Sequence, residues 1–116
     1  MSPKTDLGAV VIRNEVIASV AALAAREVPG VVDIWRGPLP FLSGLCGLGT
    51  RGVRVETKDQ EVRLWLNLVA EYEVSLPHLA AQVQDRVREV LERMTHLNAV
   101  EINVGIHHVQ TRGDLK

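Results

Sequence analysis

The chain has 116 residues, of which 47% are hydrophobic, and its formal net charge is −1. This length corresponds to one domain with one core, and the balanced charge excludes a global electrostatic attraction to nucleic acid or anionic lipid. Aromatic residues make up only 3% of the chain, so the core is predicted to be aliphatic. The only cysteine is Cys46, which excludes an intramolecular disulfide and fits a reducing compartment.

The N-terminus shows no signal-peptide pattern, and no uninterrupted apolar stretch approaches the ~18 residues of a membrane span. We therefore predict a cytoplasmic protein that would reach a membrane only through a partner or a surface patch. We expect a single domain over residues 1–116, with an ordered core from about 8 to 109 and frayed termini.

The first predicted elements are a strand, a helix and a second strand. Residues 8–12 are short, apolar and β-branched, which favours a strand. Asn14 offers an N-cap for a helix whose apolar residues recur at helical spacing. Pro29 and Gly30 end this helix, and residues 31–35 predict a short strand.

Residues 36–51 are interrupted by proline and glycine and predict an ordered loop. Two interpretations of its apolar residues stay open: they fold back over the sheet or a helix end, or they form an exposed patch for a partner or a membrane surface. Trp65 lies on the wetter face of its strand, where the loop covers it or where it anchors an interface. The candidate partner interface comprises Leu39, Phe41, Leu42, Leu45, Leu48 and Trp65.

The next pattern predicts a β-hairpin. A strand begins at Val53, residues 58–60 form a polar turn, and the following strand alternates over a long stretch. Its core-facing residues are expected to be Val62, Leu64, Leu66, Leu68, Ala70 and Tyr72. One buried face and one wet face is typical of an antiparallel sheet.

A second helix and a last strand complete the chain. Ser75 is the expected N-cap, with Pro77 tolerated in the first turn. The apolar stripe of this helix is expected to be Leu79, Val83, Val87, Val90, Leu91 and Met94. In the last strand, the alternating residues are Val100, Ile102, Val104, Ile106 and His108. The order β-α-β-loop-β-β-α-β predicts an α+β domain with two helices packed on one face of a mixed or antiparallel sheet.

No residue set predicts catalysis or a cofactor. The histidines are His78, His96, His107 and His108, and no HxxxH or CxxC spacing occurs. The adjacent pair at 107 and 108 would point to opposite faces of a strand, so we predict no metal site. Cys46 has no basic neighbour in sequence to activate a thiolate, which favours a small apolar filler over a nucleophile. An enzyme that uses Cys46 is the third hypothesis.

Residues 49–52 superficially resemble the GxxG loop of KH RNA-binding modules. That loop clamps a nucleic-acid backbone between helices, whereas here it precedes a predicted strand. Arg36, Arg51, Arg54 and Arg63 could cluster near one end of the sheet. A KH-like RNA-binding module therefore stays open as the alternative function, although the net charge makes nucleic acid an unfavourable partner.

Six motifs carry a resemblance to a known family. They are the opening strand and helix over residues 8–17 (GAVVI, then EVI), VPGV at 28–31, GVRVE at 52–56, VQDRV at 83–87, MTHL at 94–97 and VEINV at 100–104. In this order and spacing the chain resembles the bacterial alkaline shock protein family of small cell-envelope and general-stress proteins. His96 stands where that family usually has glycine.

The resemblance implies a non-enzymatic interaction or scaffold protein in cell-envelope homeostasis or the stress response, without catalytic residues or cofactors. It also implies self-association and a membrane-associated protein partner. We expect docking through a sheet edge, through the 39–48 loop, or through both, because edge strands offer unpaired backbone groups.

Overall fold

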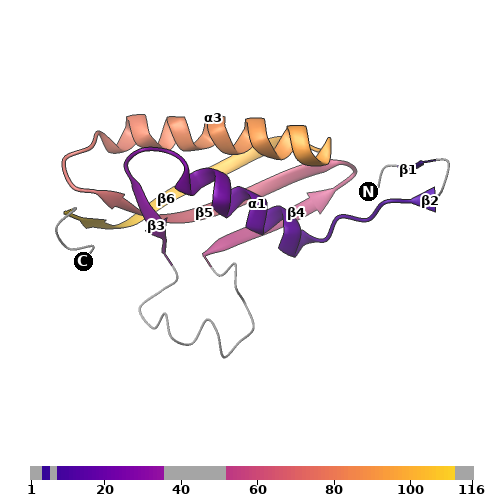
Figure 1. Cartoon of the computed structure of the whole chain (residues 1–116), viewed down its shortest axis with the longest axis horizontal. Helices are drawn as coiled ribbons and strands as arrows, with labels where there is room; N and C mark the ends of the chain where they lie inside the picture. Colours follow the sequence, from indigo (N-terminus) through magenta and orange to yellow (C-terminus); the bar gives the residue numbers. More distant parts are fainter. Residues whose placement is uncertain (1–3, 6–7, 36–51, 112–116) are drawn as a thin grey trace, which may run out of the picture.

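The computed structural model describes residues 4–5, 8–35 and 52–111. Its main body is a four-stranded sheet with two helices on one face (Figure 1). In chain order the elements are β1 Lys4–Thr5, β2 Gly8–Ala9, α1 Asn14–Arg26, β3 Val31–Ile34, β4 Val53–Lys58, β5 Glu61–Glu71, α3 Leu76–Thr95 and β6 Asn98–Gln110. The predicted α+β fold, with both helices on one face, is confirmed.

The central strand of the sheet is β5. Both β4 and β3 pair antiparallel with one edge of β5, β4 along its first half and β3 near its end. The strand β6 runs parallel to β5 along the other edge over its whole length. A parallel pair needs a long crossover connection, which α3 supplies. The sheet is therefore mixed, one of the two alternatives that the sequence left open.

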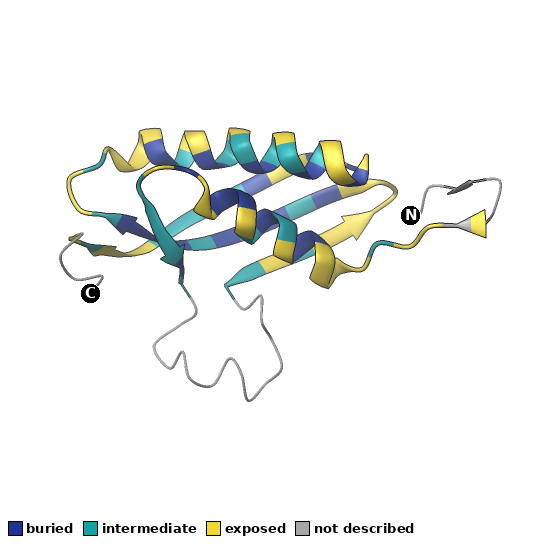
Figure 2. Cartoon of the chain, in the orientation of Figure 1, coloured by how far each residue is buried: buried dark blue, intermediate teal, exposed yellow. Residues whose placement is uncertain are grey.

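The core lies between the sheet and the two helices (Figure 2). Alternate residues of β5 are fully buried there, namely Val62, Leu64, Leu66, Leu68 and Ala70. The helices contribute Ile17, Ala21, Ala24, Ala25, Leu79, Val83, Val87 and Leu91. Every one of these side chains is aliphatic, as the composition predicts, and the small alanines of α1 allow it to approach its neighbours closely.

The prediction that Tyr72 and Met94 lie in the core is wrong. Tyr72 follows the last residue of β5 and is 58% exposed, because the chain leaves the sheet before it could continue the alternation. Met94 is 60% exposed, and Thr95 is buried in the last turn of α3 instead. The Thr95 hydroxyl donates to the carbonyl oxygen of Leu91 at 2.7 Å, which satisfies a polar group that would otherwise be costly to bury.

The N-terminal prediction needs correction. The strand expected over residues 8–12 is limited to β2, which pairs with β1 and not with the main sheet. Asn14 is the first helical residue and Arg13 holds the N-cap position. The Asn14 side-chain oxygen instead accepts from Thr57 Oγ1 at 3.2 Å, so this amide ties α1 to β4.

The second helix begins where the sequence predicts. Ser75 holds the N-cap position and Pro77 lies in the first turn of α3. The Ser75 carbonyl oxygen accepts from the Leu79 N–H at 2.9 Å, while the Ser75 hydroxyl makes no capping hydrogen bond. The position of the cap was therefore predictable, but its side-chain bond was not.

Two register shifts break the predicted alternation of β6. The pairing skips one residue at Val100 and one at His107. Val100 is consequently 43% exposed, whereas Ile102, Val104 and Ile106 pack toward the helices. His108 pairs with Val69, whose side chain lies on the other face of β5 from the buried leucines. The expected unbroken alternation from Val100 to His108 therefore holds only for Ile102, Val104 and Ile106.

The C-terminal end of α3 offers a test of backbone strain. His96 adopts a left-handed conformation, with φ of 59°, and its N–H donates to the Glu92 carbonyl oxygen at 2.9 Å. A side chain in this conformation costs about 1 kcal/mol relative to glycine. We expect His96→Gly to raise the free energy of unfolding by about 0.5–1 kcal/mol, measured by urea denaturation.

His78→Gly is the matched control, because His78 is also exposed but lies within helix α3. Glycine at that helical position is expected to lower the free energy of unfolding by about 0.5–1 kcal/mol. Equal signs for the two substitutions would contradict the role assigned to the His96 conformation.

Candidate functional site: the helix-free face of the sheet

The face of the sheet that lies opposite α1 and α3 carries a distinct group of side chains. Among the described residues, no helix covers it (Figure 1). We call it the open face, and its members are Trp35, Arg54, Arg63, Trp65, Asn67, Asn103 and His107. They alternate with the core residues along β4, β5 and β6, which is why the same strands present both surfaces.

One group on the open face forms a row across three strands. The rings of Trp35 and His107 stack with centroids 4.7 Å apart and planes at 15°. His107 Nε2 lies 2.7 Å from Asn67 Oδ1, which is a hydrogen-bond distance. The backbone N–H of Trp35 donates to the backbone carbonyl oxygen of Asn67 at 2.7 Å. Asn67 on the central strand therefore anchors the backbone at Trp35 and the ring of His107.

Gly52 fixes the same row from the start of β4. Its carbonyl oxygen accepts from the Asn67 N–H at 3.0 Å and from Asn67 Nδ2 at 3.2 Å. Its φ is +98°, and a Cβ added there would collide with the Trp35 carbonyl oxygen and lie 2.7 Å from Ile34 Cγ2. Only glycine allows the backbone to approach this closely in this conformation.

A second group lies further along β5. The Arg54 guanidinium stacks over the Trp65 ring, 4.9 Å from its centroid, which is a cation–π geometry. Arg54 also lies 3.4 Å from Glu56, and Arg63 Nε lies 3.4 Å from Glu101. Arg54 and Arg63 thus each lie near a carboxylate, and the surface is aromatic and of mixed charge.

The predicted interface residues fare differently. Trp65 is half-buried on the open face, the wetter side of its strand, as the sequence indicates. Leu39, Phe41, Leu42, Leu45 and Leu48 lie outside the described residues, so their part of the interface stays a prediction. Sequence reasoning missed the row of Trp35, Asn67 and His107, because that row depends on the β6 register shift and on cross-strand pairing.

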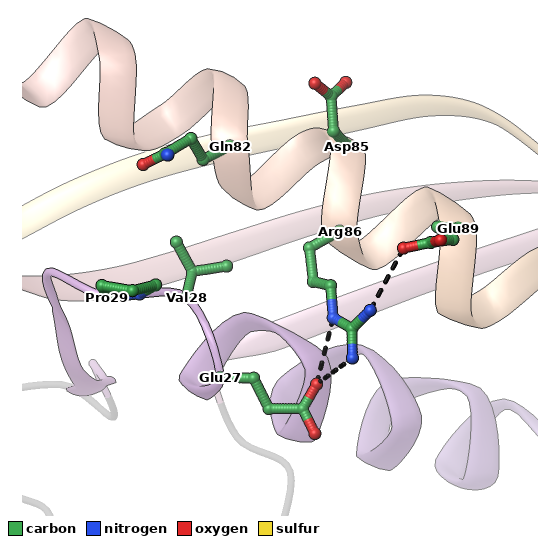
Figure 3. Close-up of a pocket in the computed structure, with 7 residues that line it drawn as sticks. All are labelled: Glu27, Val28, Pro29, Gln82, Asp85, Arg86 and Glu89. Carbon is green, nitrogen blue, oxygen red and sulfur yellow. Dashed lines mark hydrogen bonds and ion pairs between the residues drawn. The ribbon is translucent and has the colours of Figure 1, made fainter.

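The helix side has a cleft of about 590 Å³ between the end of α1 and α3 (Figure 3). Its lining residues are Glu27, Val28, Pro29, Gln82, Asp85, Arg86 and Glu89. Arg86 donates to Glu27 at 2.7 Å and 3.1 Å and to Glu89 at 3.1 Å. The hydrogen bonds to Glu27, followed by the one to Glu89, raise the pKa of Arg86. The bonds to Glu27 link the end of α1 to α3, whereas the bond to Glu89 lies within α3.

The remaining candidate chemistry is limited. All four histidines are exposed, and Cys46 lies outside the described residues. Among the residues that the structure describes, no three His, Cys, Asp or Glu side chains gather in a metal-binding arrangement. In the same part of the chain, no helix combines the length and apolar character needed to cross a membrane.

The sequence matches one protein family and several bacterial relatives. Residues 2–111 match the sequence model of the alkaline shock protein 23 family, described as having a cell envelope-related function. The uncharacterized protein YqhY of Bacillus subtilis is 38% identical over 111 residues, covering 91% of this chain and 80% of that protein. A protein of Streptococcus pyogenes named stress response regulator gls24 homolog is 29% identical over 103 residues. The match covers 85% of this chain and 57% of the streptococcal protein.

Solved structures support the fold alone. A variant of the MamM CTD superposes with a TM-score of 0.60 at 16% sequence identity, covering 85% of this chain and 86% of that chain. Other MamM CTD structures give TM-scores near 0.53.

Proposed function

Because this chain belongs to the alkaline shock protein 23 family, whose described function is cell envelope-related, we propose that it is a non-enzymatic docking protein. In this proposal it binds a membrane-associated protein partner through the open face. The streptococcal relative named as a stress response regulator supports a role in the stress response.

The observation that carries the proposal is the composition of the open face. Tryptophan and arginine are the side chains most enriched at energetic hot spots of protein interfaces. Here Arg54 stacks on Trp65 on a sheet face that no described helix covers, and Trp35 stacks on His107 nearby. The apolar run predicted for the same interface connects to the described chain at Trp35 and Gly52, which both contact Asn67. That run stays a prediction from sequence.

The charges of the open face favour a protein over nucleic acid. A nucleic-acid site needs several unpaired cations that release counterions from phosphates. Arg54 is paired with Glu56, and Arg63 lies near Glu61 and Glu101. The KH-like alternative therefore gains no support, and its other two arginines, at 36 and 51, lie outside the described residues.

Truncation of the aromatic anchor tests the proposal. We expect Trp65→Ala to weaken recovery of the protein with the membrane fraction of its native cells by at least about tenfold, because a buried hot-spot tryptophan contributes 2 kcal/mol or more, roughly. A photo-crosslinking residue at position 65 should then form an adduct with a membrane protein.

Met94→Ala is the matched control, since Met94 is a large exposed side chain on the helix side. It is expected to leave membrane recovery unchanged, and a crosslinker there should give no such adduct. If Trp65→Ala folds and is recovered with membranes as efficiently as Met94→Ala, docking through the open face is wrong.

A further inference from the structure

The two edges of the sheet differ in their protection against pairing with another strand. The β4 edge carries Arg54, Glu56 and Lys58, all exposed and charged. Next to it, β3 is short and its pairing shifts register between Val31 and Asp33. Charges, short strands and bulges are the devices by which natural proteins prevent edge-to-edge pairing.

The β6 edge lacks charges and proline over half of its length, and the one irregularity there is the register shift at His107, which lies beyond Ile106. Its beginning is covered from α3, because Arg88 donates to the Ala99 carbonyl oxygen at 3.2 Å and Gln84 to that of Ile102 at 3.0 Å. The following residues, 103–110, contain no lysine, arginine, aspartate, glutamate or proline. Among the described residues, no strand pairs with this outer edge.

The hydrogen-bonding direction of this edge follows from the pairing of β5. The Asn67 N–H and carbonyl oxygen both bond toward Gly52 and Trp35, away from β6. Backbone groups alternate in direction along a strand, so Leu66 and Leu68 bond toward β6. Their parallel partners, Val104 and Ile106, therefore direct their own N–H and carbonyl groups outward.

We propose that a second copy of this chain pairs antiparallel with this edge, about a twofold axis at Gly105. In this register Val104 of one copy lies opposite Ile106 of the other, and each pair exchanges both N–H···O bonds. The contact is isologous, with the same residues on both sides. The two four-stranded sheets become one continuous sheet.

The side chains around Gly105 fit this register. Val104 and Ile106 are half-buried on the helix side, and an apolar cross-strand pair would cover both of them. On the open face Gly105 has no side chain, and His107 leans inward over Asn67 to stack on Trp35. No side chain therefore blocks the approach of the two copies at the axis, on either face of the sheet. No like charges meet across it.

This proposal goes beyond the docking function, and its test is separate. It uses the outer edge of β6, whereas the docking test alters Trp65 on the central strand. Loss of self-pairing with intact membrane recovery, or the reverse, tells the two proposals apart.

A charge on the edge is the first test. In sedimentation equilibrium of the purified protein we expect a dimer whose dissociation constant rises at least about tenfold in Ile106→Lys, since edge lysines prevent strand addition. Met94→Lys adds the same charge on exposed α3 and should leave the dimer intact. A monomeric unmodified protein at every concentration, or a dimer that Ile106→Lys does not weaken while circular dichroism stays native, overturns the proposal.

Disulfide trapping tests the register even if Ile106→Lys does not fold. In Cys46→Ser combined with Gly105→Cys, the two cysteines would face each other with Cα atoms about 4.5 Å apart, which a disulfide accommodates. A Cβ at position 105 would lie 3.2 Å from both His107 Nε2 and Asn67 Oδ1, so these two side chains must shift by a few tenths of an ångström. We expect a covalent dimer under mild oxidation.

Cys46→Ser combined with Asn103→Cys provides the register control. The two cysteines would be displaced by four residues along the paired strands, roughly 13 Å, and should not link. Equal linking of both variants, or no linking of Gly105→Cys, excludes the proposed axis. A Gly105→Cys adduct in cells with a different protein in place of a second copy would assign the edge to a partner strand instead.

Discussion

Replacement of Gly52 by alanine is expected to lower the free energy of unfolding by about 3 kcal/mol. Part of the loss comes from φ of +98°, which costs an L-residue 1–2 kcal/mol, roughly. The rest comes from the collision of the new Cβ with the Trp35 carbonyl oxygen, a backbone atom that cannot rotate away. Urea denaturation of Gly52→Ala and the unmodified protein measures the difference.

Gly8→Ala separates the two causes. Gly8 also has a positive φ, +132°, but among the described residues nothing lies within 4 Å of a Cβ built there. This control should retain the conformational cost without the collision and lose about 1–2 kcal/mol at most. A similar loss in both variants would show that the approach of Gly52 to Trp35 is not what requires glycine.

Leu66→Ala is expected to lower the free energy of unfolding by about 3–4 kcal/mol. Leu66 is fully buried on the central strand, where closely packed neighbours cannot collapse into the space that it leaves. A thermal unfolding curve should show a correspondingly lower midpoint.

Leu23→Ala removes the same atoms from α1, where Leu23 is 60% exposed. Its expected effect is within about 0.5 kcal/mol. Comparable losses at positions 23 and 66 would contradict the assignment of the core to the space between the sheet and the helices.

The fold was largely predictable because its strongest pattern is local. The strict alternation of β5 and the apolar stripe of α3 each identify a buried face without knowledge of the partner element. Predictions failed where a distant contact decides the outcome. Asn14 bonds Thr57 on another strand and does not cap its own helix, and the register shifts at Val100 and His107 arise only from pairing with β5.

The candidate site was less predictable for the same reason. Trp65 could be assigned to the wetter face from alternation alone. The placement of Trp35 beside His107 requires β3 and β6 to lie on opposite edges of β5, with Asn67 between them. No periodicity in one segment contains that information, so a single sequence does not reveal the row.

The junction at Asn67 has a consequence for how this protein family can diverge. Trp35 and Gly52 are held by the same residue of the central strand, so the chain leaves the sheet and returns to it at neighbouring points. Joining two such fixed points costs an entropy that grows only with the logarithm of the connecting length, about 0.6 kcal/mol for each doubling. Evolution could therefore lengthen, shorten or rewrite the connection between these anchors at little expense to folding, while the scaffold is kept.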